Sequence, residues 1–256
     1  MIDLSKEHQF RKYYKFDVDN IITRASNPDY SSILDMIFSD YAASKNMKIW
    51  GLKFDNNLGT SDFSFLDKLF PGYKFIHVIR DGRDVNLSTS KVLQTGFYTP
   101  YKNAMFWKSL MLNAVKYGRS IKDRYLQVKY EDLLTNPKLE CERIAEFLDV
   151  KNFKYKEVYI KVQNFNKWKT EMKEREIRIY EAVAGDMLKE YGYEVINSRK
   201  IQLSAMNILY YNFQEFILKR MKYLEKFLSK GGGEHLMHFI RNKYSVLSWK
   251  IKLFFK

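Results

Sequence analysis

Short apolar runs alternate with longer helical stretches along this chain, and that alternation is the strongest constraint on its fold. Three runs have the length and apolar character of strands: Lys48–Phe54 (KIWGLKF), Tyr73–Ile79 (YKFIHVI) and Tyr125–Lys129 (YLQVK). Helical periodicity fills most of Leu87–Arg124, with an interruption near Gly96–Pro100. Because strands separated by crossover helices pair in parallel, the pattern predicts an α/β fold.

The two ends of the chain are predicted to be helical. Phe10–Lys45 reads as helix, turn and helix, with the break at Asn27-Pro28-Asp29. Beyond Gly192, a helical pattern runs over Ile201–Lys230, and a second helix candidate, Glu234–Lys256, follows the glycine run at 231–233. This change of character predicts a boundary near residue 197, between a domain at 1–196 and a helical extension at 197–256.

Net charge separates the two predicted regions. The chain carries +14 overall, and residues 197–256 hold 12 Lys or Arg against 3 Asp or Glu. Aromatic and basic residues interleave there, so the extension could lie on an anionic membrane surface or pack within the protein. Specific nucleic-acid binding is not expected, because basic charge alone gives only sequence-independent affinity. The polar first ten residues predict a cytoplasmic protein. If the extension contacts a membrane, the association is predicted to be peripheral.

The segment Lys74–Ser90 (KFIHVIRDGRDVNLSTS) carries the chemistry. Arg80 stands at the predicted C-terminal tip of a strand, where ligands of open α/β sheets bind, and a helix is predicted to open near Asp84. The Arg80 guanidinium suits a phosphate group, and the Ser88 hydroxyl leans back toward it along the helix. The free N–H groups of the helix start would add partial positive charge. The alternative is that Arg80, Asp81, Arg83 and Asp84 form a solvated charged loop.

This segment resembles the 3′-phosphate motif of sulfotransferases that use 3′-phosphoadenosine 5′-phosphosulfate (PAPS). Tyr125–Val150 (YLQVKYEDLLTNPKLECERIAEFLDV) and Asn166–Val195 (NKWKTEMKEREIRIYEAVAGDMLKEYGYEV) resemble two later segments of the same family, in the same order. The resemblance implies a P-loop-NTPase-like parallel sheet with flanking helices, PAPS as donor and no metal.

The resemblance also implies roles for individual residues. Arg80 and Ser88 would hold the 3′-phosphate, and Tyr130 would contact adenine unless it is a packing tyrosine. Lys167, with Lys161 and Lys169 around Trp168, falls where cytosolic members have an Arg-Lys-Gly phosphate contact, although a solvated basic turn fits equally well.

Two candidate catalytic residues follow from the same resemblance. Lys53 falls where many members have a lysine close to the sulfuryl group, and Asp55 stands where some have a histidine base. A carboxylate can act as that base only if its surroundings raise its pKa. His77 alternates with the apolar residues of its strand, so we expect it to be a satisfied interior histidine.

One signature of the family is missing from the sequence. The N-terminal strand and glycine-rich loop that would cradle the 5′-phosphosulfate have no counterpart, and no glycine precedes Lys48. The sequence therefore predicts either an N-terminally truncated sulfotransferase acting on a small-molecule or glycan hydroxyl (or amine), or a non-catalytic anion-binding or membrane-associated adaptor on the same scaffold.

Overall fold

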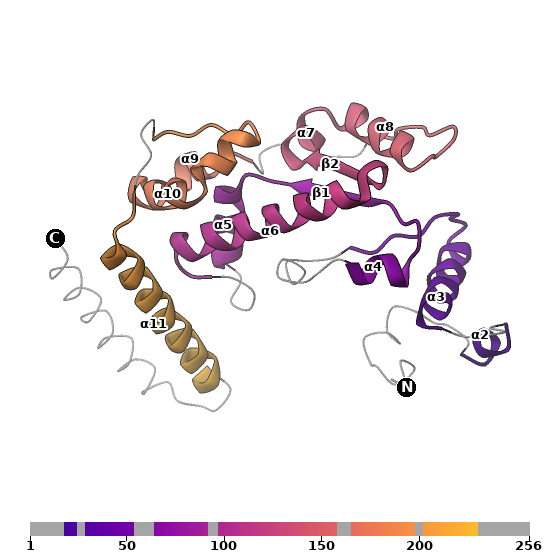
Figure 1. The fold of residues 1–256 in the computed structure, drawn as a ribbon, viewed down its shortest axis with the longest axis horizontal. Coiled ribbons are helices and arrows are strands. Elements are labelled where there is room, and N and C mark those ends of the chain that lie inside the picture. The colour runs from indigo at the N-terminus through magenta and orange to yellow at the C-terminus, as the bar shows by residue number, and fades with distance from the viewer. Residues whose placement is uncertain are drawn as a thin grey trace. The chain divides into compact units, whose positions relative to one another are not determined.

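The computed structural model describes residues 18–24, 29–53, 64–91, 97–157, 165–197 and 202–229. These form two compact units, one from Met1–Ile79 with Ser109–Glu157 and one from Arg80–Lys108 with Val158–Lys256. Helix α6 (Pro100–Ile121) contributes residues to both units (Figure 1).

The first unit holds a small parallel sheet and the helices that follow and precede it. The strands are β1 (Phe75–Ile79) and β2 (Tyr125–Lys129), which pair in register from Phe75 opposite Tyr125 to Ile79 opposite Lys129. This confirms two of the three predicted strands and their parallel pairing. Its helices are α2 (Val18–Arg24), α3 (Tyr30–Ser44), α4 (Ser64–Leu69), α7 (Tyr130–Thr135) and α8 (Pro137–Phe147), with a 3-10 turn, η3, at Lys122–Arg124.

Aromatic rings fix the pairing of the two strands. The Tyr125 ring stacks on the Phe75 ring across the sheet at 5.9 Å, and Tyr117 of α6 meets Phe75 edge-on at 5.8 Å. The Arg143 guanidinium of α8 donates to the Gln127 carbonyl of β2 over 3.0 Å. Helices α6 and α8 are thus both attached to the sheet.

The third predicted strand, Lys48–Phe54, is wrong for its described residues, 48–53, which form no strand. Of its described apolar side chains, Ile49 and Leu52 are exposed, and Trp50 packs against α3 and the end of α4. The Trp50 ring lies 4.9 Å from that of Phe38 and 5.2 Å from that of Phe70, and its indole N–H donates to Asp35. An apolar run of this length can cover a helical surface as well as a sheet.

The predicted helix, turn and helix near the N-terminus is confirmed for the described residues. Helices α2 and α3 flank the predicted break, and the Asp29 side chain caps α3 by accepting from the Ser32 backbone N–H at 2.8 Å. The chain is mostly helical with a small parallel sheet, within the predicted α/β class. Residues 1–17 lie outside the described part, so the missing N-terminal strand and loop stay a prediction.

His77 of β1 is an interior histidine, as predicted. Its Nδ1 lies 2.7 Å from the Tyr125 hydroxyl, and burial lowers the pKa of His77 to about 4. The neutral ring is therefore preferred in the folded chain, so its contribution to stability is present above the ordinary pKa of 6.5 and is lost as pH falls through 4.

We therefore expect the free energy of unfolding to fall by about 2–3 kcal/mol between pH 7 and pH 4 through His77 alone. The replacement His77→Gln keeps a polar group beside Tyr125 but does not titrate. Urea unfolding at several pH values should show a flatter profile for the variant than for the wild type. Parallel profiles would mean that His77 charges freely in the folded state.

The second unit holds the start of α6 and four further helices. These are α5 (Gly82–Lys91), α9 (Trp168–Glu171), α10 (Glu174–Glu190) and α11 (Ala205–Ser229). Both α9 and α10 contact α5. Helix α11 confirms the helical pattern predicted over Ile201–Lys230, whereas the candidate at Glu234–Lys256 lies outside the described residues.

A buried carboxylate attaches α11 to the start of α6. Glu215 accepts from the Thr99 backbone N–H and hydroxyl, both at 2.9 Å, and from the Tyr98 N–H at 3.0 Å. The Tyr211 ring also stacks on Tyr101 at 5.5 Å. One face of α11 therefore packs within the protein. For this part of the extension, the structure agrees with intramolecular packing, one of the two alternatives predicted from the sequence. Residues 158–256 and 80–108 form one compact unit, and the predicted domain boundary near residue 197 stays a prediction.

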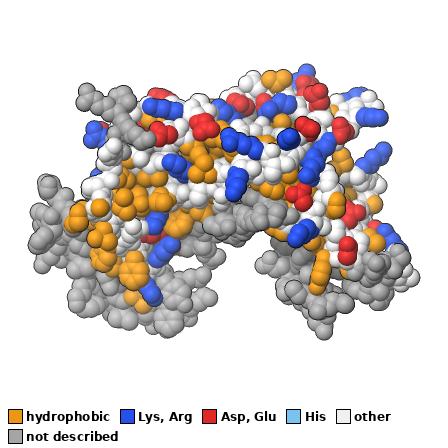
Figure 2. All heavy atoms as spheres, viewed as in Figure 1, with side chains coloured by type: hydrophobic (Ala, Val, Ile, Leu, Met, Phe, Trp, Pro, Cys, Tyr) orange, Lys and Arg blue, Asp and Glu red, His pale blue; other side chains and the backbone are white. Residues whose placement is uncertain are grey.

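The other face of α11 is apolar and exposed. Met206, Leu209, Phe213 and Phe216 are each more than half exposed, and Figure 2 shows hydrophobic side chains gathered over this helix. In the described part of the chain, every helix is too short or too polar to cross a membrane. Contact with a membrane surface through 197–256 stays a prediction.

Candidate functional site

The candidate site begins where the chain leaves β1. Arg80 follows the strand directly, and α5 begins at Gly82, two residues earlier than predicted. The Trp107 indole N–H donates to the Arg80 carbonyl over 3.1 Å, which fixes the backbone at this point. The Arg80 side chain is 25% exposed, although its Nε atom is buried.

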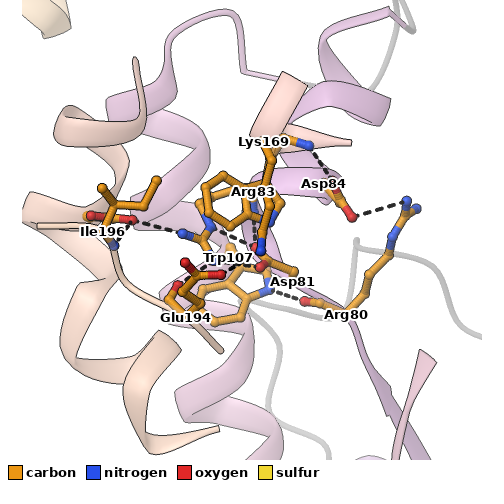
Figure 3. A network of polar contacts seen from close by, with 10 residues as sticks. Arg80, Asp81, Arg83, Asp84, Trp107, Lys169, Glu194 and Ile196 are labelled. Carbon is orange, nitrogen blue, oxygen red and sulfur yellow. Dashed lines mark hydrogen bonds and ion pairs between the residues drawn. The ribbon is translucent and has the colours of Figure 1, made fainter. Parts of the chain in front are cut away.

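A buried charge network lies under this loop (Figure 3). The Arg83 guanidinium is fully buried and grips both oxygens of Asp81, at 3.0 and 2.7 Å, with the paired geometry that suits a carboxylate. It also donates to Glu181 of α10 at 2.8 Å. Glu181 in turn accepts from the backbone N–H groups of Ile196 and Asn197. The network therefore ties the start of α5 to α10 and to the chain that follows α10.

Trp168 covers Arg83 from α9. Its ring is 1% exposed, and the Arg83 guanidinium carbon lies 3.4 Å from the ring centroid, a stacked cation–π contact. Lys169 pairs with Glu194 at 2.5 Å, and this contact lowers the pKa of the Glu194 carboxyl. The turn at 167–169 is thus held in place by the same network that holds Arg83.

Asp84 joins the α9 turn to Arg80. Its Oδ1 accepts from the Trp168 backbone N–H at 2.9 Å, and its Oδ2 lies 4.0 Å from the Arg80 guanidinium. The side chain is fully buried, and burial raises the pKa of this carboxyl against the opposing effect of the Trp168 N–H and Arg80. Sequence reasoning missed Asp84 and Trp168 as a contact pair, because 84 positions separate them.

The predicted alternative of a solvated charged loop is wrong for three of its four residues. Asp81, Arg83 and Asp84 are 3%, 0% and 1% exposed. Local sequence could not distinguish a solvated loop from a buried one. The groups that stabilise the buried charges are Glu181 of α10 and the Trp168 backbone of α9, both distant in the sequence. Of these four residues, Arg80 is the one whose charged side chain is partly exposed.

The predicted site residues divide between the two units. Arg80, Ser88 and Lys167 belong to the second unit, where Ser88 is an exposed residue of α5 and Lys167 precedes α9. Since α5 begins at Gly82, Ser88 is nearly two turns into the helix and shares a face with Asp84. Tyr130 and Lys53 belong to the first unit: Tyr130 is the half-buried first residue of α7, and Lys53 is exposed. Asp55 and Lys161 lie outside the described residues. The roles predicted for all these residues stay predictions.

A comparison with known families decides the class of this protein. A family model described as the sulfotransferase family matches residues 8–154, more than half of the chain. The chain belongs to the sulfotransferase family. This confirms the family resemblance that was based on the segments Lys74–Ser90 and Tyr125–Val150. The Trp168 turn lies beyond the matched residues.

The chain resembles individual members of the family over a shorter stretch. It is 34% identical to protein-tyrosine sulfotransferase A of Caenorhabditis elegans over 91 residues, and 36% identical to the protein-tyrosine sulfotransferase of Drosophila melanogaster over 92 residues. Each alignment covers 34% of this chain, but only 24% and 18% of the respective relatives. The chain thus matches a quarter or less of the length of these two proteins.

Metal ligands are not gathered in the part of the chain that the structure describes. Across residues 18–24, 29–53, 64–91, 97–157, 165–197 and 202–229, no three His, Cys, Asp or Glu side chains are placed to hold a metal ion. The prediction that the reaction needs no metal remains open.

Proposed function

We propose that this chain binds PAPS through Arg80 and Ser88 and belongs to an enzyme that transfers the sulfuryl group to an acceptor hydroxyl. The observation that carries the proposal is the Arg80 side chain. It is the partly exposed cation of a loop whose other charged side chains are buried and paired. A guanidinium held by a fixed backbone at a strand tip, next to a helix start, suits a phosphate monoester.

The buried network supports this role by fixing the platform under Arg80. Arg83 is fully occupied by its ion pairs with Asp81 and Glu181, so its positive charge is not available to a ligand. The Arg83 backbone N–H at the start of α5 already donates to Asp81 Oδ1 at 2.9 Å, so an incoming phosphate would meet the Arg80 guanidinium as its main positive group. Placing the binding cation on a packed scaffold lowers the entropy lost when the ligand is bound.

In the proposed reaction, the acceptor oxygen attacks sulfur as the bond between sulfur and the bridging phosphate oxygen breaks. Adenosine 3′,5′-bisphosphate leaves, and a base takes the acceptor's proton. Lys53 and Asp55 are the candidates near that step. The names of the relatives favour a tyrosine hydroxyl of a protein as acceptor, in place of the small molecule or glycan expected from the sequence.

Calorimetry with adenosine 3′,5′-bisphosphate tests the donor site. We expect the replacement Arg80→Ala to weaken binding about 100-fold, because a charge-assisted contact to a dianion is lost. Adenosine 5′-monophosphate lacks the 3′-phosphate, so its affinity should be low and insensitive to the replacement. Arg178→Ala is the matched control, because Arg178 is an exposed arginine of α10 with a 3.6 Å ion pair to Glu174. Equal affinity of wild type and Arg80→Ala for the bisphosphate would contradict the proposal.

The acceptor is tested separately. We expect labelled sulfuryl transfer from PAPS to a tyrosine-containing peptide and none to the same peptide with phenylalanine in place of tyrosine. Transfer to a sugar hydroxyl would instead support a glycan acceptor. Nucleotide binding without transfer to any acceptor would favour the non-catalytic adaptor.

A further inference from the structure

Asp84 occupies a place between the two residues proposed to hold the phosphate. It lies four positions before Ser88 on the same face of α5, and its carboxylate lies 4.0 Å from the guanidinium of Arg80, which precedes the helix. Its Oδ1 is satisfied by the Trp168 N–H at 2.9 Å. Its Oδ2 is buried and accepts no hydrogen bond from the described residues, with the Arg80 guanidinium 4.0 Å away. Burying a carboxylate oxygen without a hydrogen-bond donor raises the free energy of the ionised form. The nearby Arg80 guanidinium partly offsets this by stabilising the negative charge of Asp84.

Arg83 and Lys169, two of the cations near Asp84, are paired with other carboxylates. On its own helix, Arg83 is paired with Asp81 and Glu181, and Asp81 adds a second negative charge nearby. From α9, Lys169 is paired with Glu194, while the backbone N–H groups of Trp168 and Asn166 favour the ionised carboxylate. Lys167 stands at the start of the same turn, and α10 presents Glu181 and the buried Tyr180 hydroxyl. Arg80 is the cation whose ion pair reaches Asp84.

We propose that Asp84 is a positioning residue that holds the Arg80 guanidinium in the ligand-free chain and is displaced from it by the nucleotide's phosphate. This inference rests on the proposed function, since it takes Arg80 as the phosphate-binding residue. Through its bond to the Trp168 N–H, Asp84 also links the state of Arg80 to the α9 turn.

Displacement has a consequence for protons. A phosphate dianion and a carboxylate beside one guanidinium repel each other in a site where solvent is scarce, so the carboxyl takes up a proton as the phosphate binds. Burial already raises the pKa of Asp84, which brings that proton closer to neutral pH. Protonated Asp84 could then donate a hydrogen bond from Oδ2, the atom that accepts none in the ligand-free chain.

The replacement Asp84→Asn separates the charge from the structural bond. Asparagine keeps an oxygen to accept from the Trp168 N–H but cannot ionise. We expect it to bind adenosine 3′,5′-bisphosphate roughly three- to tenfold more tightly than the wild type at pH 8, because the competing charge is gone. The advantage should shrink toward pH 5.5, where wild-type Asp84 is more readily protonated. The nucleotide's own phosphate titration affects both proteins equally, so the ratio of affinities reports on Asp84.

Calorimetry at pH 7.5 in buffers of different ionisation enthalpy measures the proton directly. Wild type should take up more protons on binding than Asp84→Asn, because the contribution of the nucleotide's phosphate is common to both. Asp149→Asn, which changes an exposed carboxylate of the first unit, is the matched control and should leave both affinity and proton uptake unchanged. Weaker binding by folded Asp84→Asn, or affinity profiles that run parallel with pH, would overturn the proposal. A purely structural role for Asp84 would not produce the change in proton uptake.

A ligand-free measurement keeps this inference distinct from the proposed function. The carboxyl carbon of Asp84 can be titrated by NMR in wild type and in Arg80→Gln. Loss of the cation should raise the Asp84 pKa, because Arg80 favours the ionised form. If neither the wild type nor Arg80→Gln binds the bisphosphate, but the Asp84 pKa still rises in Arg80→Gln, the proposed function fails while the pairing of Asp84 with Arg80 stands. An unchanged Asp84 pKa would overturn the pairing, whatever the nucleotide result.

Discussion

Replacing Arg83 with alanine should lower the free energy of unfolding by about 3–5 kcal/mol, because two buried carboxylates lose the cation between them. Arg83 is fully buried, donates to Asp81 at 2.7 and 3.0 Å and to Glu181 at 2.8 Å, and stacks on Trp168. Urea unfolding followed by circular dichroism measures the loss. A lysine at this position should recover part of it, since it restores the charge but not the paired geometry.

The control for this prediction is another arginine of the second unit. Arg178 of α10 is 61% exposed and lies 3.6 Å from a Glu174 side chain that is 83% exposed. Exposed ion pairs of this kind contribute little, so Arg178→Ala should change stability by less than about 0.5 kcal/mol. If Arg83→Ala cost no more than Arg178→Ala, the buried network would not be what holds the start of α5 to α10.

Replacing Gly82 with alanine should cost about 3 kcal/mol or more, although it adds a single methyl group. A Cβ atom at Gly82 would overlap the hydroxyl of buried Tyr180 and come within 2.5 and 2.8 Å of two ring carbons of Trp107. Neither ring can retreat to solvent. Since the Trp107 indole donates to the Arg80 carbonyl, we also expect weaker binding of adenosine 3′,5′-bisphosphate.

Gly185 is the matched control, because it is a buried glycine of the neighbouring helix α10. A Cβ atom there would meet only ordinary contacts, at 3.7 Å from Glu181 and 3.9 Å from Val195. Alanine favours a helix over glycine, so Gly185→Ala should be neutral or stabilising by up to about 1 kcal/mol. Thermal unfolding of the two variants tests the contrast. Similar melting temperatures would mean that Gly82 is not in close contact with the two rings.

Hydrophobic pattern predicted the elements that depend on local sequence. Turn residues and periodicity in the sequence predicted β1, β2 and the helices that surround them. The prediction failed at Lys48–Phe54, where Trp50 packs on Phe38 and Phe70. A short apolar run does not by itself determine whether its side chains enter a sheet, pack on helices as Trp50 does, or stay exposed as Ile49 does.

The sequence by itself determined the family, the parallel pairing of two strands and the position of Arg80 at a strand tip, because these depend on order and spacing along the chain. Only the tertiary structure decided what the neighbours of Arg80 do. Asp81, Arg83 and Asp84 have the composition of a solvated loop, and burial becomes favourable only where Glu181 and the Trp168 backbone supply their partners from 98 and 84 positions away. Charged side chains enter the interior when such distant groups pair them, and no local pattern records that pairing.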